Sequence, residues 1–385
     1  MSQPKTIDAA TDENFMRRAI ELAARGQGRV EPNPLVGCVI VRDGQIVGEG
    51  YHQAYGGHHA EVEAIRSLGA SYAQGATAYV SLEPCCHHGK TPPCTDSLIK
   101  AGVKRVVFAM EDPFPKVAGG GARQLSESGI EVTRDVLREE AIKLNRPYLK
   151  RIEAGKPWVI AKWAMTVDGK IATHTGSSQW ITSAPSRLDV HQTRARVDGI
   201  ITGMGTVRSD NPELNARLPP EFGKPPRIAD RIVMCRQSIP AAESKLLSTA
   251  AQIPVRLVVG PNVTQSQIDQ ASSLGAVIHR VDEMVPSRYL CKSLQLLAEL
   301  GMTNLLVEAG SELLASFFDA REIDEYHIYM GPLIVGNQQA PSPIGGTGVK
   351  LMNQALRLAL DSVQPLGDDV KIIYRSREES RENEL

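Results

Sequence analysis

The chain has 385 residues, a formal net charge of −1 and 42% hydrophobic residues, which is enough for about two globular domains. A net charge so close to zero excludes the broad positive field that holds nucleic acid or an anionic membrane. The sequence has no apolar run of about 18 residues, and residues 1–13 lack the apolar core of a signal peptide. Six cysteines without a paired framework are typical of a reducing compartment. We therefore expect a cytoplasmic protein whose partners are small molecules, and neither nucleic acid nor a membrane.

The first half of the chain alternates between helical and strand patterns. Residues 14–25 have the periodicity of an amphipathic helix. The apolar residues 36–41 and 46–51 predict two strands joined by the hairpin signal Arg42-Asp43-Gly44-Gln45. Further short strands are predicted at 78–82, 106–110 and 130–132, and a long helix at 135–152.

A break at Gly155-Lys156-Pro157 ends this pattern, because glycine and proline interrupt regular structure. A new strand is predicted over 158–165. Further strands are predicted near residues 200, 232, 257, 305, 328 and 372, with helices near 185–195, 290–300 and 311–319. Alternating strands and helices indicate the α/β class. The sequence therefore predicts two α/β domains, residues 1–154 and 155–385.

The most specific chemical signal is His59-Ala60-Glu61, followed by Cys85 and Cys94. One imidazole and two thiolates can hold zinc and leave a fourth position for water, whose pKa the metal lowers to about 7. A carboxylate outside the metal ligands can carry the proton to departing ammonia, and Glu61 suits that role. His59 and Glu61 lie where a glycine-containing loop meets an apolar-periodic run, so both are expected in the first turn of a helix. The pattern is typical of zinc-dependent hydrolytic deaminases.

The spacing of the two cysteines differs from the usual deaminase pattern. Zinc deaminases typically place about two residues between these cysteines, whereas residues 86–93 separate Cys85 from Cys94 here. We expect this insertion to determine substrate selectivity. The alternative is that His59, Cys85 and Cys94 are structural core residues. These three residues and Glu61 would then match the order of one mechanism by chance.

Other cysteines and histidines near these residues have simpler interpretations. Cys86 and His58 adjoin the expected ligands but are interpreted as loop neighbours. Cys38, Cys235 and Cys291 lie in apolar runs and are expected in the core.

Several motifs together resemble the RibD family of bacterial bifunctional riboflavin biosynthesis proteins, over roughly residues 12–375. In the first half these motifs are Asn33-Pro34, the strand 36–41, His59-Ala60-Glu61, Leu82-Glu83-Pro84-Cys85, the segment 87–94, Asp112-Pro113 and Lys116-Val117-Ala118-Gly119. In the second half they are Asp168-Gly169-Lys170, Ser178-Gln179-Trp180-Ile181-Thr182, Asp210-Asn211-Pro212 and Val307-Glu308-Ala309-Gly310.

The resemblance implies a cytidine-deaminase-like three-layer α/β/α domain followed by a dihydrofolate-reductase-like α/β domain. It implies Zn²⁺ and NADPH as cofactors and two successive reactions. In the first, the 2-amino group of 2,5-diamino-6-(5-phosphoribosylamino)pyrimidin-4-one is hydrolysed to a carbonyl. In the second, NADPH reduces the ribosyl group of 5-amino-6-(5-phosphoribosylamino)uracil to ribityl.

The resemblance also implies roles for residues of the deaminase half. Asn33 and His52 would contact the pyrimidine, and His87, Lys90 and Thr91 would lie near the phosphoribosyl group. The last two offer an ammonium and a hydroxyl suited to a phosphate. Two positions depart from the family pattern: Phe114 stands where asparagine is common, and Gly120 where arginine is usual. These departures remove the basis for a polar contact from that loop and leave the metal chemistry unaffected.

The reductase half has weaker signals of its own. Gly203-Met204-Gly205 follows a predicted strand and has two glycines of a dinucleotide loop, but it lacks the third. Gly310-Ser311 begins a second strand-to-helix turn, whose free N–H groups could hold a diphosphate. By resemblance, the NADPH site is lined by Ala164, Trp180, Thr206, Asp210, Gly310 and Ser311. The ribosyl substrate would contact Lys162, Ser178, Arg194, Leu214, Arg217 and Glu308.

The two arginines, Arg194 and Arg217, could clamp the substrate phosphate bidentately, or they could be exposed arginines in salt bridges. Two other functions stay open from the residues alone. One is a nucleoside or base deaminase fused to a binding module that is not a reductase. The other is a non-enzymatic zinc-stabilised domain, which would need a closed metal site. We expect a homo-oligomer, whose size the sequence does not define.

Overall fold

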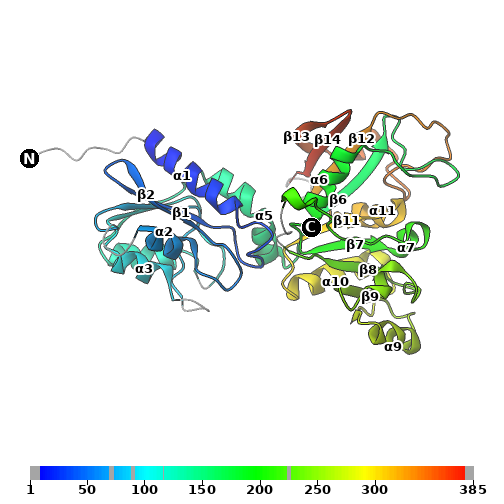
Figure 1. Cartoon of the computed structure of the whole chain (residues 1–385), viewed down its shortest axis with the longest axis horizontal. Coiled ribbons are helices and arrows are strands. Elements are labelled where there is room, and N and C mark those ends of the chain that lie inside the picture. Colours follow the sequence, from blue (N-terminus) through cyan, green and yellow to red (C-terminus); the bar gives the residue numbers. More distant parts are fainter. Residues whose placement is uncertain (1–8, 69–72, 88–91, 116, 223–226, 378–385) are drawn as a thin grey trace, which may run out of the picture. The chain divides into compact units, whose positions relative to one another are not determined.

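The chain divides into two compact units, each with its own sheet and buried core. The computed structural model describes residues 9–68, 73–87, 92–115, 117–222 and 227–377. Unit 1 is Met1–Gly155 and unit 2 is Lys156–Leu385. In Figure 1, the elements of unit 1 are coloured from blue through cyan to blue-green and those of unit 2 from green to red.

Unit 1 is a three-layer α/β/α domain built on a five-stranded sheet of order β2-β1-β3-β4-β5. Strand β1 is antiparallel to β2 and β3, whereas β3, β4 and β5 are parallel. The elements are α1 (Ala9–Ala24), β1 (Gly37–Arg42), β2 (Gln45–Tyr51), α2 (Ala60–Leu68), β3 (Thr77–Val80), α3 (Cys94–Lys100), β4 (Arg105–Phe108), α4 (Gly120–Glu127), β5 (Glu131–Thr133) and α5 (Arg138–Ala154).

Both faces of this sheet are covered by helices. Cys38 and Ile40 of β1 pack with residues of α2, α3 and α4, whereas Val39 and Val41 pack with residues of α1 and α5. Successive side chains of a strand point to opposite faces, so the continuous apolar run of β1 produces a strand buried on both sides. Gly50 of β2 permits close approach of a helix, because a Cβ there would lie 2.3 Å from the backbone of α2.

Unit 2 is an α/β domain built on a nine-stranded sheet of order β10-β9-β8-β7-β11-β6-β12-β14-β13. The strands from β10 to β12 in this order are parallel, and β14 and β13 complete the sheet in antiparallel pairs. The strands are β6 (Trp158–Thr166), β7 (Gly199–Gly203), β8 (Asp230–Cys235), β9 (Val255–Val259), β10 (Val277–Arg280), β11 (Asn304–Glu308), β12 (Glu325–Gly331), β13 (Leu358–Leu366) and β14 (Asp369–Ser376). The α-helices are α6 (Ala184–Arg194), α7 (Met204–Asp210), α8 (Lys245–Ser248), α9 (Gln265–Ser273), α10 (Pro286–Glu299) and α11 (Ser311–Asp319).

The central strand β11 shows how the core of unit 2 is divided. Leu305 and Val307 pack with residues of α10 and α11 on one face, and Leu306 packs with residues of α7, α8 and α9 on the other. The functional loops follow the carboxyl ends of β6, β7, β8 and β11, which are parallel and therefore end at the same edge of the sheet. Within the described ranges, every helix is too short or too polar to cross a lipid bilayer.

The structure confirms the predicted α/β class and adds elements that the sequence analysis omitted. The added strands are β10 and β13, and the added helices are α3, α4, α7, α8 and α9. Strand β13 lies at the edge of the sheet and exposes Leu360 and Val363, so its sequence lacks the alternation of a half-buried strand. One core assignment was wrong: Cys291 is only half-buried, and its thiol donates to Glu322 at 3.4 Å.

Candidate active sites

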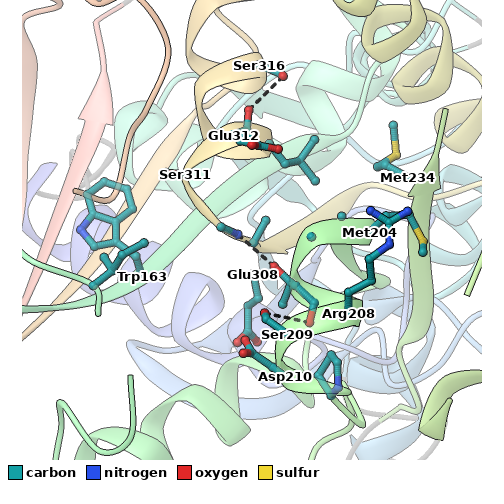
Figure 2. A pocket seen from close by; sticks show the side chains of 18 of the residues that line it. Trp163, Met204, Arg208, Ser209, Asp210, Met234, Glu308, Ser311, Glu312 and Ser316 are labelled. Carbon is teal, nitrogen blue, oxygen red and sulfur yellow. Dashed lines mark hydrogen bonds between the residues drawn. The ribbon is translucent and has the colours of Figure 1, made fainter. Parts of the chain in front are cut away.

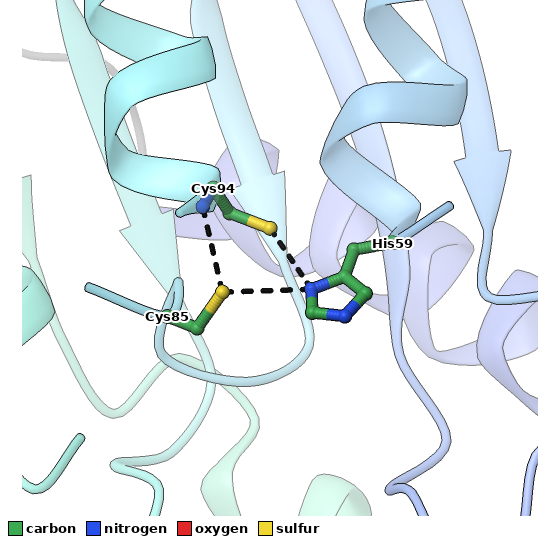
Figure 3. Close-up of side chains that lie close together, drawn as sticks. All are labelled: His59, Cys85 and Cys94. Atoms are coloured by element: carbon green, nitrogen blue, oxygen red, sulfur yellow. Dashed lines mark hydrogen bonds between the residues drawn. The ribbon is translucent and has the colours of Figure 1, made fainter. Parts of the chain in front are cut away.

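Three side chains from separate elements of unit 1 meet at one point. His59 directly precedes α2, Cys94 is the first residue of α3, and Cys85 lies in the loop after β3. Figure 3 shows the imidazole of His59 facing both sulfur atoms. Its Nδ1 lies 3.2 Å from Sγ of Cys94 and 3.5 Å from Sγ of Cys85, and one ligand atom from each residue lies within 4.8 Å of the others. One nitrogen and two sulfurs are a donor set that fits zinc.

The electrostatics of this cluster distinguish its members. Hydrogen bonds from Cys94 and His59 lower the pKa of the Cys85 thiol, which favours the thiolate that a metal requires. Glu61, in the first turn of α2, is only 3% exposed, and burial together with Cys85 raises its pKa. Its carboxylate is not a member of the three-residue cluster. This is expected of a residue that carries protons and does not bind the metal.

The loop that carries Cys85 is fixed to α4. The buried carboxylate of Glu83 accepts hydrogen bonds from the backbone N–H groups of Gly119 and Ala122, at 3.0 and 2.9 Å, at the start of this helix. Cys86 is not in the metal cluster. A Cβ at Gly120 would lie 2.8 Å from the sulfur of Cys86, so this glycine leaves the space that the neighbouring thiol occupies.

A cavity of about 330 Å³ lies against the metal cluster and is lined by His59, Glu61 and Cys85. Asn33 and His52, predicted to contact the pyrimidine, also line it. Nδ1 of His52 lies 2.9 Å from the carbonyl oxygen of His58, which can only accept, so Nδ1 carries the proton. Nε2 then accepts from the side-chain amide of Asn33 at 3.1 Å. Burial lowers the pKa of His52, which favours this neutral form. Because the amide nitrogen of Asn33 faces Nε2 of His52, the carbonyl oxygen of Asn33 is directed away from the histidine.

The remaining wall of the cavity combines one predicted residue, His87, with three residues to which no role was assigned from the sequence. His87, predicted near the phosphoribosyl group, lies beside Phe114 with ring centroids 5.9 Å apart. Asp112, Tyr148 and Arg151 also line the cavity. The sequence signal for the last two was the turn-by-turn spacing of Tyr148 and Arg151 along the predicted helix. Lys90 and Thr91 lie outside the described residues.

A larger cavity of about 790 Å³ lies in unit 2, at the edge where the parallel strands end (Figure 2). It brings together ten residues that were predicted for the reductase from separate segments. For the cofactor they are Ala164, Thr206, Asp210, Gly310 and Ser311, and for the substrate they are Lys162, Ser178, Arg194, Leu214 and Glu308. The hydroxyl of Thr206 accepts from the backbone N–H of Gly310 at 3.0 Å, which joins the two loops predicted to hold the dinucleotide.

Glu308, the last residue of β11, connects the charged groups of this cavity. Nε and Nη2 of Arg194 donate to its two carboxylate oxygens at 2.6 and 2.8 Å, and Nζ of Lys162 lies 3.8 Å away. Burial raises the pKa of Glu308, but the charges of Arg194 and Lys162 outweigh burial and lower the pKa to about 2. In this arrangement Nε and Nη2 of Arg194 donate to Glu308, and Nη1 donates to the backbone carbonyl of Asn215 at 3.1 Å. A phosphate would therefore meet the remaining N–H groups of Arg194 or replace one of these acceptors.

Two predicted residues, Trp180 and Arg217, lie outside the lining of the cavity among the described residues. The ring of Trp180 is 65% exposed, and the guanidinium of Arg187 stacks over it at 4.5 Å. Arg217 is exposed, and its guanidinium donates to Glu213 at 2.9 Å. Its backbone N–H donates to Nδ1 of His191 at 3.2 Å.

The cavity of unit 2 also has a cationic end that the sequence analysis missed. Arg208 of α7 and Arg236, just after β8, both line the cavity with Ser238. Nη2 of Arg208 donates to Oγ of Ser238 at 2.7 Å. Arg236 follows the second strand of the strand-helix-strand unit β7-α7-β8. In dinucleotide-binding units of this kind, an acidic residue at this position binds the ribose 2′-hydroxyl, and an arginine accommodates a 2′-phosphate. The volume of the cavity and these cations fit NADPH.

The fold and the two sites define the class of protein: a zinc-dependent deaminase joined to a dinucleotide-dependent reductase. Two family models match the chain accordingly. The cytidine and deoxycytidylate deaminase zinc-binding region matches residues 9–110, and the RibD C-terminal domain matches residues 157–372.

Individual relatives and structures agree with these matches. The riboflavin biosynthesis protein RibD of Actinobacillus pleuropneumoniae is 43% identical over 94% of this chain and 95% of its own length. The RibD protein of Bacillus amyloliquefaciens is 42% identical over 94% of this chain and 95% of its own length. Among solved structures, Acinetobacter baumannii RibD has a TM-score of 0.86 at 37% identity and covers 96% of this chain and 99% of its own. The chain belongs to the RibD family and is a bifunctional deaminase and reductase of riboflavin biosynthesis, with zinc and NADPH as cofactors.

Proposed function

We propose that unit 1 hydrolyses the 2-amino group of 2,5-diamino-6-(5-phosphoribosylamino)pyrimidin-4-one. We propose further that unit 2 reduces the ribosyl group of the resulting 5-amino-6-(5-phosphoribosylamino)uracil to ribityl. A Thermotoga maritima structure with a TM-score of 0.83 and 33% identity carries both activities in its name, as a diaminohydroxyphosphoribosylaminopyrimidine deaminase and 5-amino-6-(5-phosphoribosylamino)uracil reductase. The single observation that carries the proposal is the cavity in which the metal cluster, Glu61 and the Asn33 amide face the same space.

In the proposed deamination, His59, Cys85 and Cys94 hold zinc, which supplies a Lewis acid and lowers the pKa of water to about 7 when bound. The side chain of Asn33, oriented by His52, binds the polar edge of the pyrimidine. The buried carboxylate of Glu61 moves a proton from the attacking water to the amino group that leaves as ammonia.

In the proposed reduction, NADPH supplies the hydride when it is bound. Thr206, Asp210, Gly310 and Ser311 would bind its phosphates and sugar, and Ala164 would lie beside its ring. Trp180 is proposed for the same site, although its exposed ring lies outside the cavity lining among the described residues. Lys162, Ser178, Leu214 and Glu308 would hold the opened ribose. Arg194 and Arg217 are proposed to bind the phosphate of the reductase substrate. Lys90 and Thr91 are proposed to bind the phosphate of the deaminase substrate.

The test is incubation of the full chain with the phosphoribosylamino pyrimidine, with and without NADPH, followed by mass spectrometry of the product. Without NADPH we expect one amino group to be replaced by a carbonyl, and with NADPH we expect a further two-electron reduction. Activity on free cytidine without any oxidation of NADPH would favour a nucleoside deaminase fused to a binding module.

We also propose that the protein works in the cytoplasm as a homo-oligomer on small molecules. The six cysteines are all free, as is typical of a reducing compartment. Exposed Leu360 and Val363 on the edge strand β13 support pairing with a second copy. Light scattering on the eluting protein would give the number of subunits.

A further inference from the structure

Helix α5 is fixed to two walls of the deaminase cavity. The side chain of Asn145 is 1% exposed; its Oδ1 accepts from the backbone N–H of Leu35 at 2.8 Å, and its Nδ2 donates to the carbonyl of Leu35 at 2.9 Å. Leu35 lies in the loop that carries Asn33. One turn later, the hydroxyl of Tyr148 donates to Oδ1 of Asp112 at 2.8 Å, in the loop that carries Phe114.

The next turn of this helix places Arg151 at the same cavity. Side chains three or four positions apart are neighbours on a helix surface, so Asn145, Tyr148 and Arg151 follow one another along one side of α5. Arg151 and the adjacent Ile152 both line the cavity. Among the described lining residues, Arg151 is the single lysine or arginine.

The carboxylates of this cavity wall are compensated by other donors. Asp112 accepts from Tyr148 and from the backbone N–H of Phe114 at 3.0 Å, and burial raises its pKa. Glu83 accepts from two N–H groups at the start of α4. Asp112 and Glu83 therefore have hydrogen-bond donors other than Arg151.

We propose that Arg151 binds the 5-phosphate of the deaminase substrate, with α5 as the rigid support that presents it. A guanidinium matches a phosphate with two parallel hydrogen bonds, and a fixed helix lowers the entropy cost of holding that fork in place. The proposal rests on the proposed function, because it takes a phosphoribosyl substrate as given. It adds a cation on helix α5 to Lys90 and Thr91, the residues already proposed at this phosphate, and makes Arg151 one of the groups that distinguish a phosphorylated substrate from a dephosphorylated one.

The test compares deamination of the phosphoribosylamino pyrimidine and of its 5-hydroxyl counterpart by the zinc-loaded full chain. Arg151→Ala should raise KM for the phosphorylated substrate about tenfold or more and leave KM for the 5-hydroxyl substrate unchanged. Arg151→Lys, which keeps the charge and loses the fork, should give an intermediate KM. Ribose 5-phosphate should inhibit the wild type competitively and inhibit Arg151→Ala at least about tenfold less well.

Arg146→Ala is the matched control, since Arg146 lies on the same helix and outside the lining of the cavity. It should leave both KM values unchanged, and zinc content and thermal unfolding should be the same in all variants. An equal rise of KM for both substrates in Arg151→Ala and Arg151→Lys, or no rise for either, would overturn the assignment. Failure of the proposed function would appear differently, as a wild type that deaminates neither substrate.

Discussion

The two halves of this chain carry their chemistry in different ways. In unit 1, the ligand atoms of His59, Cys85 and Cys94 lie within 4.8 Å of one another, where the loop after β3 meets the starts of α2 and α3. In unit 2, the corresponding cavity is assembled from loops after several strands, and its centre is an ion-pair network around Glu308. Metal chemistry needs particular atoms at a particular spacing, whereas hydride transfer is the cofactor's own chemistry and needs mainly orientation.

This difference predicts how each half responds to change. A site made of three metal ligands fails completely when one is lost, because the metal is lost with it. A distributed site loses binding energy contact by contact. The two kinds of failure should be separable within one chain, because each unit has its own core and its own cavity.

Removal of zinc should have the largest effect and should fall on one half only. Chelation should abolish deamination, while reduction of pre-deaminated substrate by NADPH should continue at the wild-type rate. Cys85→Ser should reproduce the loss of metal, and Cys86→Ser should retain it, since Cys86 lies outside the ligand cluster. Metal analysis and NADPH absorbance measure the two outcomes. Loss of both activities on chelation would contradict the independence of the two sites.

Glu61→Gln should separate metal binding from proton transfer within unit 1. The carboxylate is not one of the clustered ligands, so zinc content should stay near stoichiometric. Deamination should fall about 100-fold or more, the usual scale for a positioned acid or base. Steady-state rates and metal analysis on the same sample would check this. A variant that loses its zinc would show that Glu61 is a metal ligand.

The same contrast explains what could be predicted from the sequence. The sequence predicted the α/β class of both halves and the grouping of His59, Cys85 and Cys94, because motif spacing and apolar periodicity are local properties. The role of Glu61 stays a prediction. It did not predict β13, whose edge position leaves it exposed and without a period-two pattern. Short helices such as α7 and α8 carry too few turns for periodicity to show.

Contacts between residues that are distant in the sequence could not be predicted either. The sequence did not indicate that the fork of Arg194 would meet Glu308, which is 114 positions away, or that Asn145 would bind Leu35. These contacts depend on the order of strands in each sheet, which no local pattern encodes. Arg236 was missed for a related reason: it follows β8 directly, and its meaning depends on β7 and β8 being neighbours.

Glu308→Gln should change how the free energy of unfolding depends on pH, because Glu308 is the centre of the ion-pair network in unit 2. A pKa lowered from an ordinary value of about 4.3 to about 2 corresponds to about 3 kcal/mol of stability for the charged form. This contribution is fully present above the unfolded pKa and is lost as the pH falls from about 4.3 toward 2. Glu308→Gln should lack this part of the pH dependence, whereas Glu299→Gln, at an exposed site, should keep it. Denaturant unfolding followed between pH 2 and 6 would measure the difference, and parallel curves for Glu308→Gln and wild type would contradict the network.

Arg236→Ala should have a smaller effect, confined to one contact of the distributed site. Arg236 and Arg208 line the cavity beside Ser238, where the 2′-phosphate of NADPH would lie after a strand-helix-strand unit. Loss of one charge-assisted contact should raise the Kd for NADPH about tenfold and leave the Kd for NADH unchanged, because NADH has no 2′-phosphate. Fluorescence titration of the full chain with each cofactor measures both values, and Arg280→Ala, at an exposed arginine, is the control. Equal weakening of NADPH and NADH would instead mean that Arg236 shapes the cavity, and the 2′-phosphate would then have to be assigned to Arg208 and Ser238 alone.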